Sequence, residues 1–132
     1  MLLNDGAGNF TVNRNFPAIG DPYDANFATT AVIADFDNDG FGDVAVGWQR
    51  PSEHTIANDV VNSAGAVFYN NGNNDWRDRI VALPANYFGA NGLANDMQAF
   101  DFDGDGFVDI VLASTKHDPY YDGRYVQFFK NI

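Results

Sequence analysis

The sequence predicts an all-β fold made of β-propeller-type blades, each with four antiparallel strands. Three observations support this prediction. The chain repeats itself with a period of 66 residues, short runs rich in β-branched and aromatic residues alternate with Gly, Asn and Asp, and no ten-residue stretch carries an apolar stripe of helical period. Repeated groups of four short strands are typical of propeller blades, each of which packs against its neighbours.

The repeat is clearest in an acidic segment of nine residues. Residues 35–43 read DFDNDGFGD, and residues 101–109 read DFDGDGFVD. The turn NDG at residues 4–6 returns at the same offset as NNG. Because 132 is twice 66, residues 1–132 form one region of two repeats, 1–66 and 67–132. We expect one complete blade at about 30–83 and a partial blade at either end, so the propeller is either partial or completed by an oligomer.

Each expected strand is a short run of strand-forming residues that ends at turn residues. Asn-Gly turns predict hairpins after the first and fifth of these runs, because Asn and Gly tolerate the positive φ of tight turns. Trp48 and Trp76 stand at strand ends and are expected in the core between blades. The expected strands are residues 2–3, 10–12, 30–34, 44–48, 66–69, 76–83, 97–100, 110–113 and 125–129.

The charge balance excludes several classes of partner. Seven Lys and Arg face eighteen Asp and Glu, which gives a formal charge of −11, while 45% of the residues are hydrophobic and can build a core. So acidic a surface repels phosphate groups, which excludes nucleic acid and lipid headgroups and favours cations. No apolar run approaches the roughly 18 residues of a membrane span, and residues 1–6 lack the pattern of a signal peptide. The chain has no Cys, which excludes a disulfide framework, a thiolate metal site and a cysteine nucleophile.

The two acidic segments have the spacing of a calcium loop. Carboxylates stand at loop positions 1, 3, 5 and 9, Gly stands at position 6, and a backbone carbonyl is available at position 7. Without a cation, two such charges about 5 Å apart repel by about 3 kcal/mol at an effective dielectric constant of about 20. The alternative is an exposed Asp-Gly turn, which a second copy at a constant offset disfavours.

The flanks and position 12 narrow the kind of calcium loop. An EF-hand needs a bidentate Glu at position 12 and a helix on each side, whereas this chain has Val46 and Leu112 there and strand-like flanks. Dockerin-type loops fail for the same reason. Magnesium is disfavoured because it keeps several waters and strict octahedral geometry.

Residues 35–47 and 101–113 resemble the FG-GAP or VCBS repeat, the calcium-binding blade of integrin α-subunit propellers and of many bacterial surface proteins. The resemblance implies an extracellular or cell-surface location and two structural Ca²⁺ ions. Family propellers close with more blades than this chain holds, so further blades would come from a parent chain or from other copies in a homo-oligomer. The ligands that the resemblance implies are Asp35, Asp37, Asp39, the Phe41 carbonyl and Asp43 for one ion, and Asp101, Asp103, Asp105, the Phe107 carbonyl and Asp109 for the other.

The expected function is a non-catalytic calcium-binding module for adhesion or for recognition of a glycan or protein ligand. Two alternatives remain: the propeller part of a carbohydrate-active enzyme such as a polysaccharide lyase, and a pure self-assembly module. The acidic residues are largely committed to the metal loops, which weighs against an enzyme.

Strand parity predicts a second functional region. If the calcium loops share one rim, the long loops at residues 13–28, 49–64, 84–95 and 114–123 share the opposite rim, where binding residues usually lie. A sugar could stack there on tyrosine rings; the favoured alternative is that the tyrosines pack the loop onto the blade, as expected also for Tyr87 and Phe88. His54 is expected at the surface. The candidate ligand-binding residues are Lys116, His117, Tyr120, Tyr121, Asp122 and Arg124.

Overall fold

The computed structural model is all-β, with one short 3-10 turn, η1 (Gly89–Asn91). It describes residues 1–17, 27–49, 63–116 and 122–132. Within these ranges, no helix is long and apolar enough to cross a membrane. The strands are β1 (Leu2–Asn4), β2 (Phe10–Val12), β3 (Phe27–Ala34), β4 (Asp43–Gln49), β5 (Gly65–Tyr69), β6 (Arg79–Ala82), β7 (Gly92–Phe100), β8 (Asp109–Lys116) and β9 (Asp122–Phe129).

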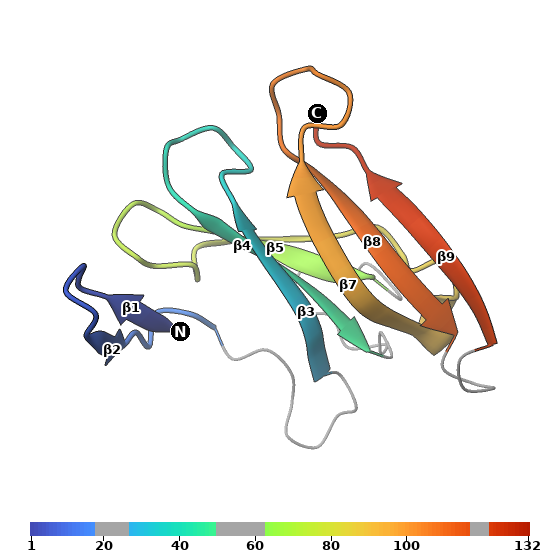
Figure 1. The fold of residues 1–132 in the computed structure, drawn as a ribbon, viewed down its shortest axis with the longest axis horizontal. Coiled ribbons are helices and arrows are strands. Elements are labelled where there is room, and N and C mark those ends of the chain that lie inside the picture. Colours follow the sequence, from blue (N-terminus) through green and yellow to red (C-terminus); the bar gives the residue numbers. More distant parts are fainter. Residues whose placement is uncertain (18–26, 50–62, 117–121) are drawn as a thin grey trace.

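The strands form two antiparallel meanders and a separate hairpin (Figure 1). Strands β3, β4, β5 and β6 pair in chain order and make the first meander. Strands β7, β8 and β9 make the second meander, which continues the same sheet through one backbone pairing, Gln49 with Leu93. The hairpin β1–β2 is a two-stranded sheet of its own. The all-β prediction is therefore confirmed, and the sheet stays open.

The two meanders repeat one another in register. Ala34 pairs with Asp43, and 66 residues later Phe100 pairs with Asp109. Each first strand carries a bulge at the same repeat position, at residues 28–30 and at residues 94–96. From β8 to β9 the chain is shorter, so that the third strands correspond at an offset of 61 instead: Val44 pairs with Phe68, and Ile110 with Phe129.

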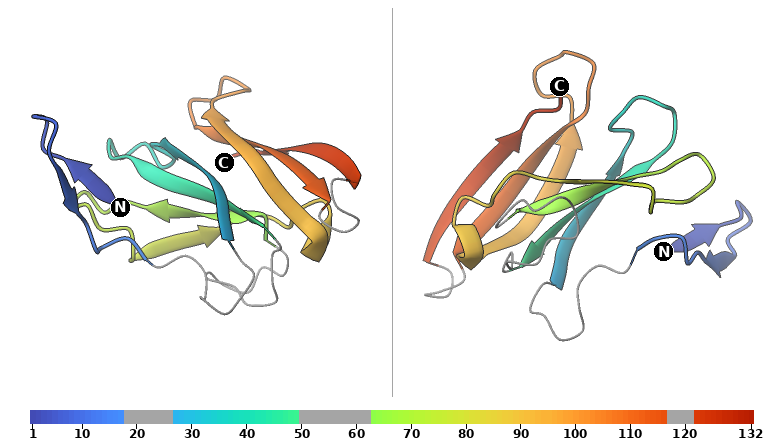
Figure 2. Two further views of the ribbon diagram at one scale, coloured as in Figure 1. Left: turned by 60° about the horizontal axis from the view of Figure 1, so that its bottom comes forward. Right: turned by 180° about the vertical axis from the view of Figure 1, so that it is seen from behind.

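Strand β4 is buried on both faces because the first meander lies between two other layers. Figure 2 shows the hairpin on one side of it and the second meander on the other. Toward the second meander, one core cluster includes Ala45, Val67, Met97 and Leu112. Toward the hairpin, the other cluster comprises Val44, Val46, Trp48, Ala66, Phe68 and Trp76, with Leu3, Phe16 and Ile80 packed against it.

The predicted strands are all present, with shifted ends. The fourth strand of the first meander begins at Arg79 instead of 76, because Trp76 turns into the core and its indole N–H donates to the carbonyl of Gly42 at 3.2 Å. Strand β7 begins at Gly92 instead of 97, since the bulge lets its pairing with β8 continue. The burial predicted for Trp48 and Trp76 is confirmed. The β3–β4 and β7–β8 loops lie at the same end of the molecule (Figure 1).

Candidate metal centre

The two acidic loops, residues 35–42 and 101–108, have one backbone conformation. Gly40 and Gly106 both adopt φ = 91°. At loop position 4, Asn38 (φ = 60°) and Gly104 (φ = 79°) are also left-handed. Asn and Gly are the residues that enter this region at low cost, so the sequence encodes the same tight loop twice.

The carboxylate at loop position 1 closes each loop on itself. Asp35 accepts hydrogen bonds from the backbone N–H groups of Asp39 (3.1 Å) and Gly40 (2.9 Å). Asp101 accepts the same two bonds from the residues four and five positions later, at 3.2 Å and 2.9 Å. These bonds wrap the backbone around the first carboxylate and bring the alternate carboxylates together.

Three carboxylates converge in each loop, with ligand atoms within 4.8 Å of one another. They are Asp35, Asp37 and Asp39 in the first loop, and Asp101, Asp103 and Asp109 in the second. One oxygen, Oδ1 of Asp37, is buried without a hydrogen-bond donor among the described residues. A converging set of carboxylate oxygens with one buried and unpaired atom fits a hard cation such as Ca²⁺, which takes six to eight oxygens.

The carboxylates at position 9 are fully buried and join each loop to the third strand of its meander. Asp43 accepts the backbone N–H groups of Phe36 (2.9 Å) and Asn70 (2.8 Å). Asp109 accepts the equivalent bonds from Phe102 (3.2 Å) and Asn131 (2.8 Å). Burial raises the pKa of Asp43, while the two N–H donors oppose that rise. These bonds give the position-9 carboxylates a structural role.

The predicted ligand sets are thus only partly brought together. Asp43 lies outside the converging group of the first loop, and Asp105 lies outside that of the second. Asp105 instead accepts the backbone N–H of Phe107 at 2.9 Å, as Asp39 accepts that of Phe41.

A cation from an outer strand reaches each loop. The guanidinium of Arg79 in β6 contacts Asp37 at 2.6 Å and also lies 3.7 Å from the ring centroid of Tyr69. The ammonium of Lys130 contacts Asp103, and Asp105 at 3.1 Å. The Phe107 N–H and Lys130 lower the pKa of Asp105, and the two carboxylates raise the pKa of Lys130. Sequence reasoning missed Arg79 and Lys130, because only strand pairing brings them to the loops.

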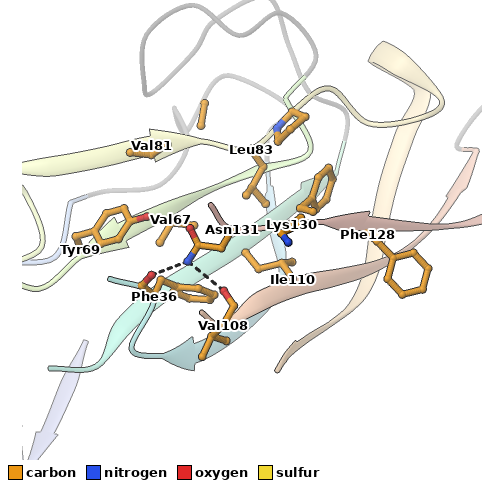
Figure 3. Close-up of a pocket in the computed structure, with 13 residues that line it drawn as sticks. Phe36, Val67, Tyr69, Val81, Leu83, Val108, Ile110, Phe128, Lys130 and Asn131 are labelled. Atoms are coloured by element: carbon orange, nitrogen blue, oxygen red, sulfur yellow. Dashed lines mark hydrogen bonds between the residues drawn. The ribbon is translucent and has the colours of Figure 1, made fainter. Parts of the chain in front are cut away.

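Asn131 ties the two meanders together next to the loops. Its side-chain amide donates to the carbonyl oxygens of Phe36 (2.6 Å) and Val108 (3.2 Å), across a cleft of about 440 Å³ (Figure 3). The equivalent Asn70 donates to the carbonyl of Gly42 at 3.4 Å. Sequence reasoning missed this pair too. The available signal was an Asn directly after Tyr69 and directly after Lys130, at the ends of two third strands.

The candidate ligand-binding residues lie at the opposite end of the second meander. Lys116 ends β8 and pairs with Asp122 of β9, and Arg124 lines a surface depression of about 530 Å³. The loop-packing prediction for Tyr87 is confirmed, since its ring stacks on Tyr125 at 3.7 Å. The remaining residues of this prediction, His117, Tyr120 and Tyr121, and also His54, lie outside the described residues.

Comparison with known proteins gives no match to the chain among family models, curated proteins or solved structures.

Proposed function

We propose that this chain is a non-catalytic, calcium-stabilised module of propeller-type blades that serves adhesion or ligand recognition at the cell surface or outside the cell. In this proposal the first meander is a complete four-stranded blade, the second meander is a blade of three strands, and the hairpin β1–β2 is the outer half of a third. The alternating register and the constant offset of the first two strands support the repeat.

The observation that carries the calcium proposal is the repeated convergence of three carboxylates in a tight loop. The buried, unpaired Oδ1 of Asp37 adds to it, because a buried oxygen without a donor is costly unless a ligand satisfies it. Two Ca²⁺ ions would also reduce the formal charge from −11 to −7.

The role of calcium in this proposal is structural. Each loop joins the first two strands of a meander, and its position-9 carboxylate holds the end of the third. An ion in the loop would offset the repulsion between the carboxylates, so that part of its binding energy becomes folding energy.

A thermal melt with calcium and then with excess chelator tests the proposal. A ligand that binds only the folded chain adds about 2.7 kcal/mol at a concentration of about 100 times its dissociation constant, so calcium should raise the melting temperature. Asp37→Asn and Asp103→Asn should each reduce the calcium-induced rise. Asp78→Asn is the matched control, since Asp78 is exposed and accepts a bond from Asn71, away from both loops. An unchanged melting temperature in calcium would refute the proposal.

The depression beside Arg124 supports the recognition part of the proposal. Its lining includes Asn95, Thr115 and Ser114, whose buried Oγ has no partner among the described residues. Polar groups around a shallow apolar surface suit the hydroxyls and the ring faces of a sugar. A glycan array probed with wild type and with Arg124→Ala tests this: binding that is lost in the variant supports the assignment, and binding that is unaffected moves the site elsewhere.

A further inference from the structure

The first meander is covered on both faces within the chain, and this sets a standard for its neighbours. One face packs against Met97, Ile110 and Leu112 of the second meander. The other face packs against Leu3 and Phe16 of the N-terminal segment. The outer pieces of the molecule repeat the same positions, so each of their exposed side chains can be compared with a buried equivalent.

The N-terminal hairpin exposes an apolar patch that consists of Leu2, Phe10 and Val12. These residues share one face, because Leu2 pairs with Val12 across the hairpin while Leu3 points into the core. Leu2 is 62% exposed, whereas its equivalent 66 residues later, Phe68, is fully buried. Phe10 is 61% exposed, whereas its equivalent, Trp76, is 3% exposed. We call this surface the N-terminal patch.

The second meander exposes an aromatic patch on the face that points away from the first. It comprises Phe100, Phe102, Val126 and Phe128. The rings of Phe100 and Phe128 both pack edge-on against that of Phe102, at 6.3 Å and 5.4 Å. We call this surface the C-terminal patch.

The C-terminal patch repeats positions that the first meander buries. Phe102 is 37% exposed, and its equivalent, Phe36, is 3% exposed. Phe128 is 61% exposed, and its equivalent at the offset of 61, Val67, is 5% exposed. In the first meander these positions lie under the second meander.

The two patches therefore belong to opposite sides of the same repeating stack. The N-terminal patch repeats the face that the first meander turns to the layer before it, and the C-terminal patch repeats the face that it turns to the layer after it. Contiguous exposed apolar surface of this kind marks an interaction site.

We propose that a second copy of this chain covers the C-terminal patch with its N-terminal patch, so that copies associate head to tail. Such an interface is heterologous: each copy uses two different surfaces, and assembly continues until the ring closes or a filament forms. The proposal stands on burial at equivalent positions and does not require the acidic loops to bind calcium.

Sedimentation of the full chain tests the proposal, with calcium present throughout. The wild type should exceed the monomer mass of 14.5 kDa and grow with concentration. Phe10→Asp closes one end and Phe128→Asp closes the other, so each variant alone should be monomeric. A mixture of the two retains one intact N-terminal and one intact C-terminal patch, and should form a one-to-one dimer and nothing larger.

Leu2→Asp and Val126→Asp provide a second pair of variants at exposed positions should either Phe variant fail to fold. Tyr87→Asp is the control, because this exposed side chain lies in neither patch, and its variant should assemble like the wild type. A wild type that stays monomeric overturns the proposal. A Phe10→Asp variant that assembles normally also overturns it, since the contact would then join two C-terminal patches. Calcium melts on the monomeric Phe128→Asp variant test the metal proposal separately.

Discussion

The side-chain amide of Asn38, in the first acidic loop, donates a hydrogen bond of 3.1 Å to the backbone carbonyl of Gly106, in the second. The two residues are 68 positions apart in the chain. This bond places the two candidate metal loops side by side, and Asn131 adds a further bond to the carbonyl of Phe36. The loops are therefore linked directly to each other as well as through their meanders.

Replacing Asn38 separates its two roles. Asn38→Gly removes the bond to Gly106 but still allows φ = 60°, so the free energy of unfolding should fall by about 1 kcal/mol. Asn38→Ala loses the same bond and adds the left-handed strain of about 1 kcal/mol or more, so the loss should be about twice as large. Urea unfolding measures both values. Equal losses in the two variants would show that the backbone conformation carries no cost at this position.

Removing Lys130 should strengthen the effect of calcium. Its ammonium neutralises Asp103 and Asp105, and a cation that enters the second loop must compete with it. In Lys130→Ala, calcium meets the full carboxylate charge, so the calcium-induced rise in melting temperature should exceed that of the wild type. Arg77→Ala serves as the control because Arg77 pairs with Asp75, outside both loops. A rise equal to or below that of the wild type would count against competition between lysine and metal.

Asp43 and Asp109 should matter even without calcium. An Asn in place of Asp43 offers one acceptor oxygen, and its NH₂ group would face a backbone N–H donor. A buried unsatisfied donor costs about 1–3 kcal/mol, so Asp43→Asn and Asp109→Asn should each destabilise the chain by that amount in excess chelator. Denaturant unfolding measures the loss, with the exposed Asp78→Asn as reference. Variants that lose stability only in calcium would leave these carboxylates with a ligand role alone.

Gly47 tests the packing between the meanders. A Cβ atom at this position would lie 2.9 Å from the Cβ of Ala94 and 2.9 Å from Cγ2 of Thr30. Gly47→Ala should therefore destabilise the chain by about 1–3 kcal/mol through overpacking. The equivalent residue of the second meander is already Ala113, on the face that carries the C-terminal patch, and Ala113→Gly should have a much smaller effect in the monomer. Thermal melts of the two variants make the comparison, and similar losses would argue against a crowded first interface.

Local features were predictable from the sequence. The 66-residue offset located both acidic loops and the strand pairs around them, because Asp-Gly turns and alternating apolar residues act over a few positions. Strand ends were less predictable. The bulge at residues 94–96 lets β7 start five residues earlier than the run at 97–100 indicates, and the turn of Trp76 into the core delays β6.

The site was predictable only in its first layer. The alternating carboxylates follow from spacing, but the membership of each converging group does not, since Asp43 and Asp105 stand apart from theirs. Arg79, Lys130, Asn70 and Asn131 reach the loops from strands that pair far along the chain. No periodicity marks such residues.

The sequence by itself determined the all-β class, the repeat and the tight acidic loops, because each depends on neighbouring residues and on the φ values that Asn and Gly permit. Only the tertiary structure decided which equivalent positions are buried. Phe36 and Phe102 occupy the same place in two copies of one motif, yet the first lies under a neighbouring sheet and the second lies in the exposed C-terminal patch. Burial depends on what packs against a face, and that partner is encoded elsewhere in the chain or in another copy of it.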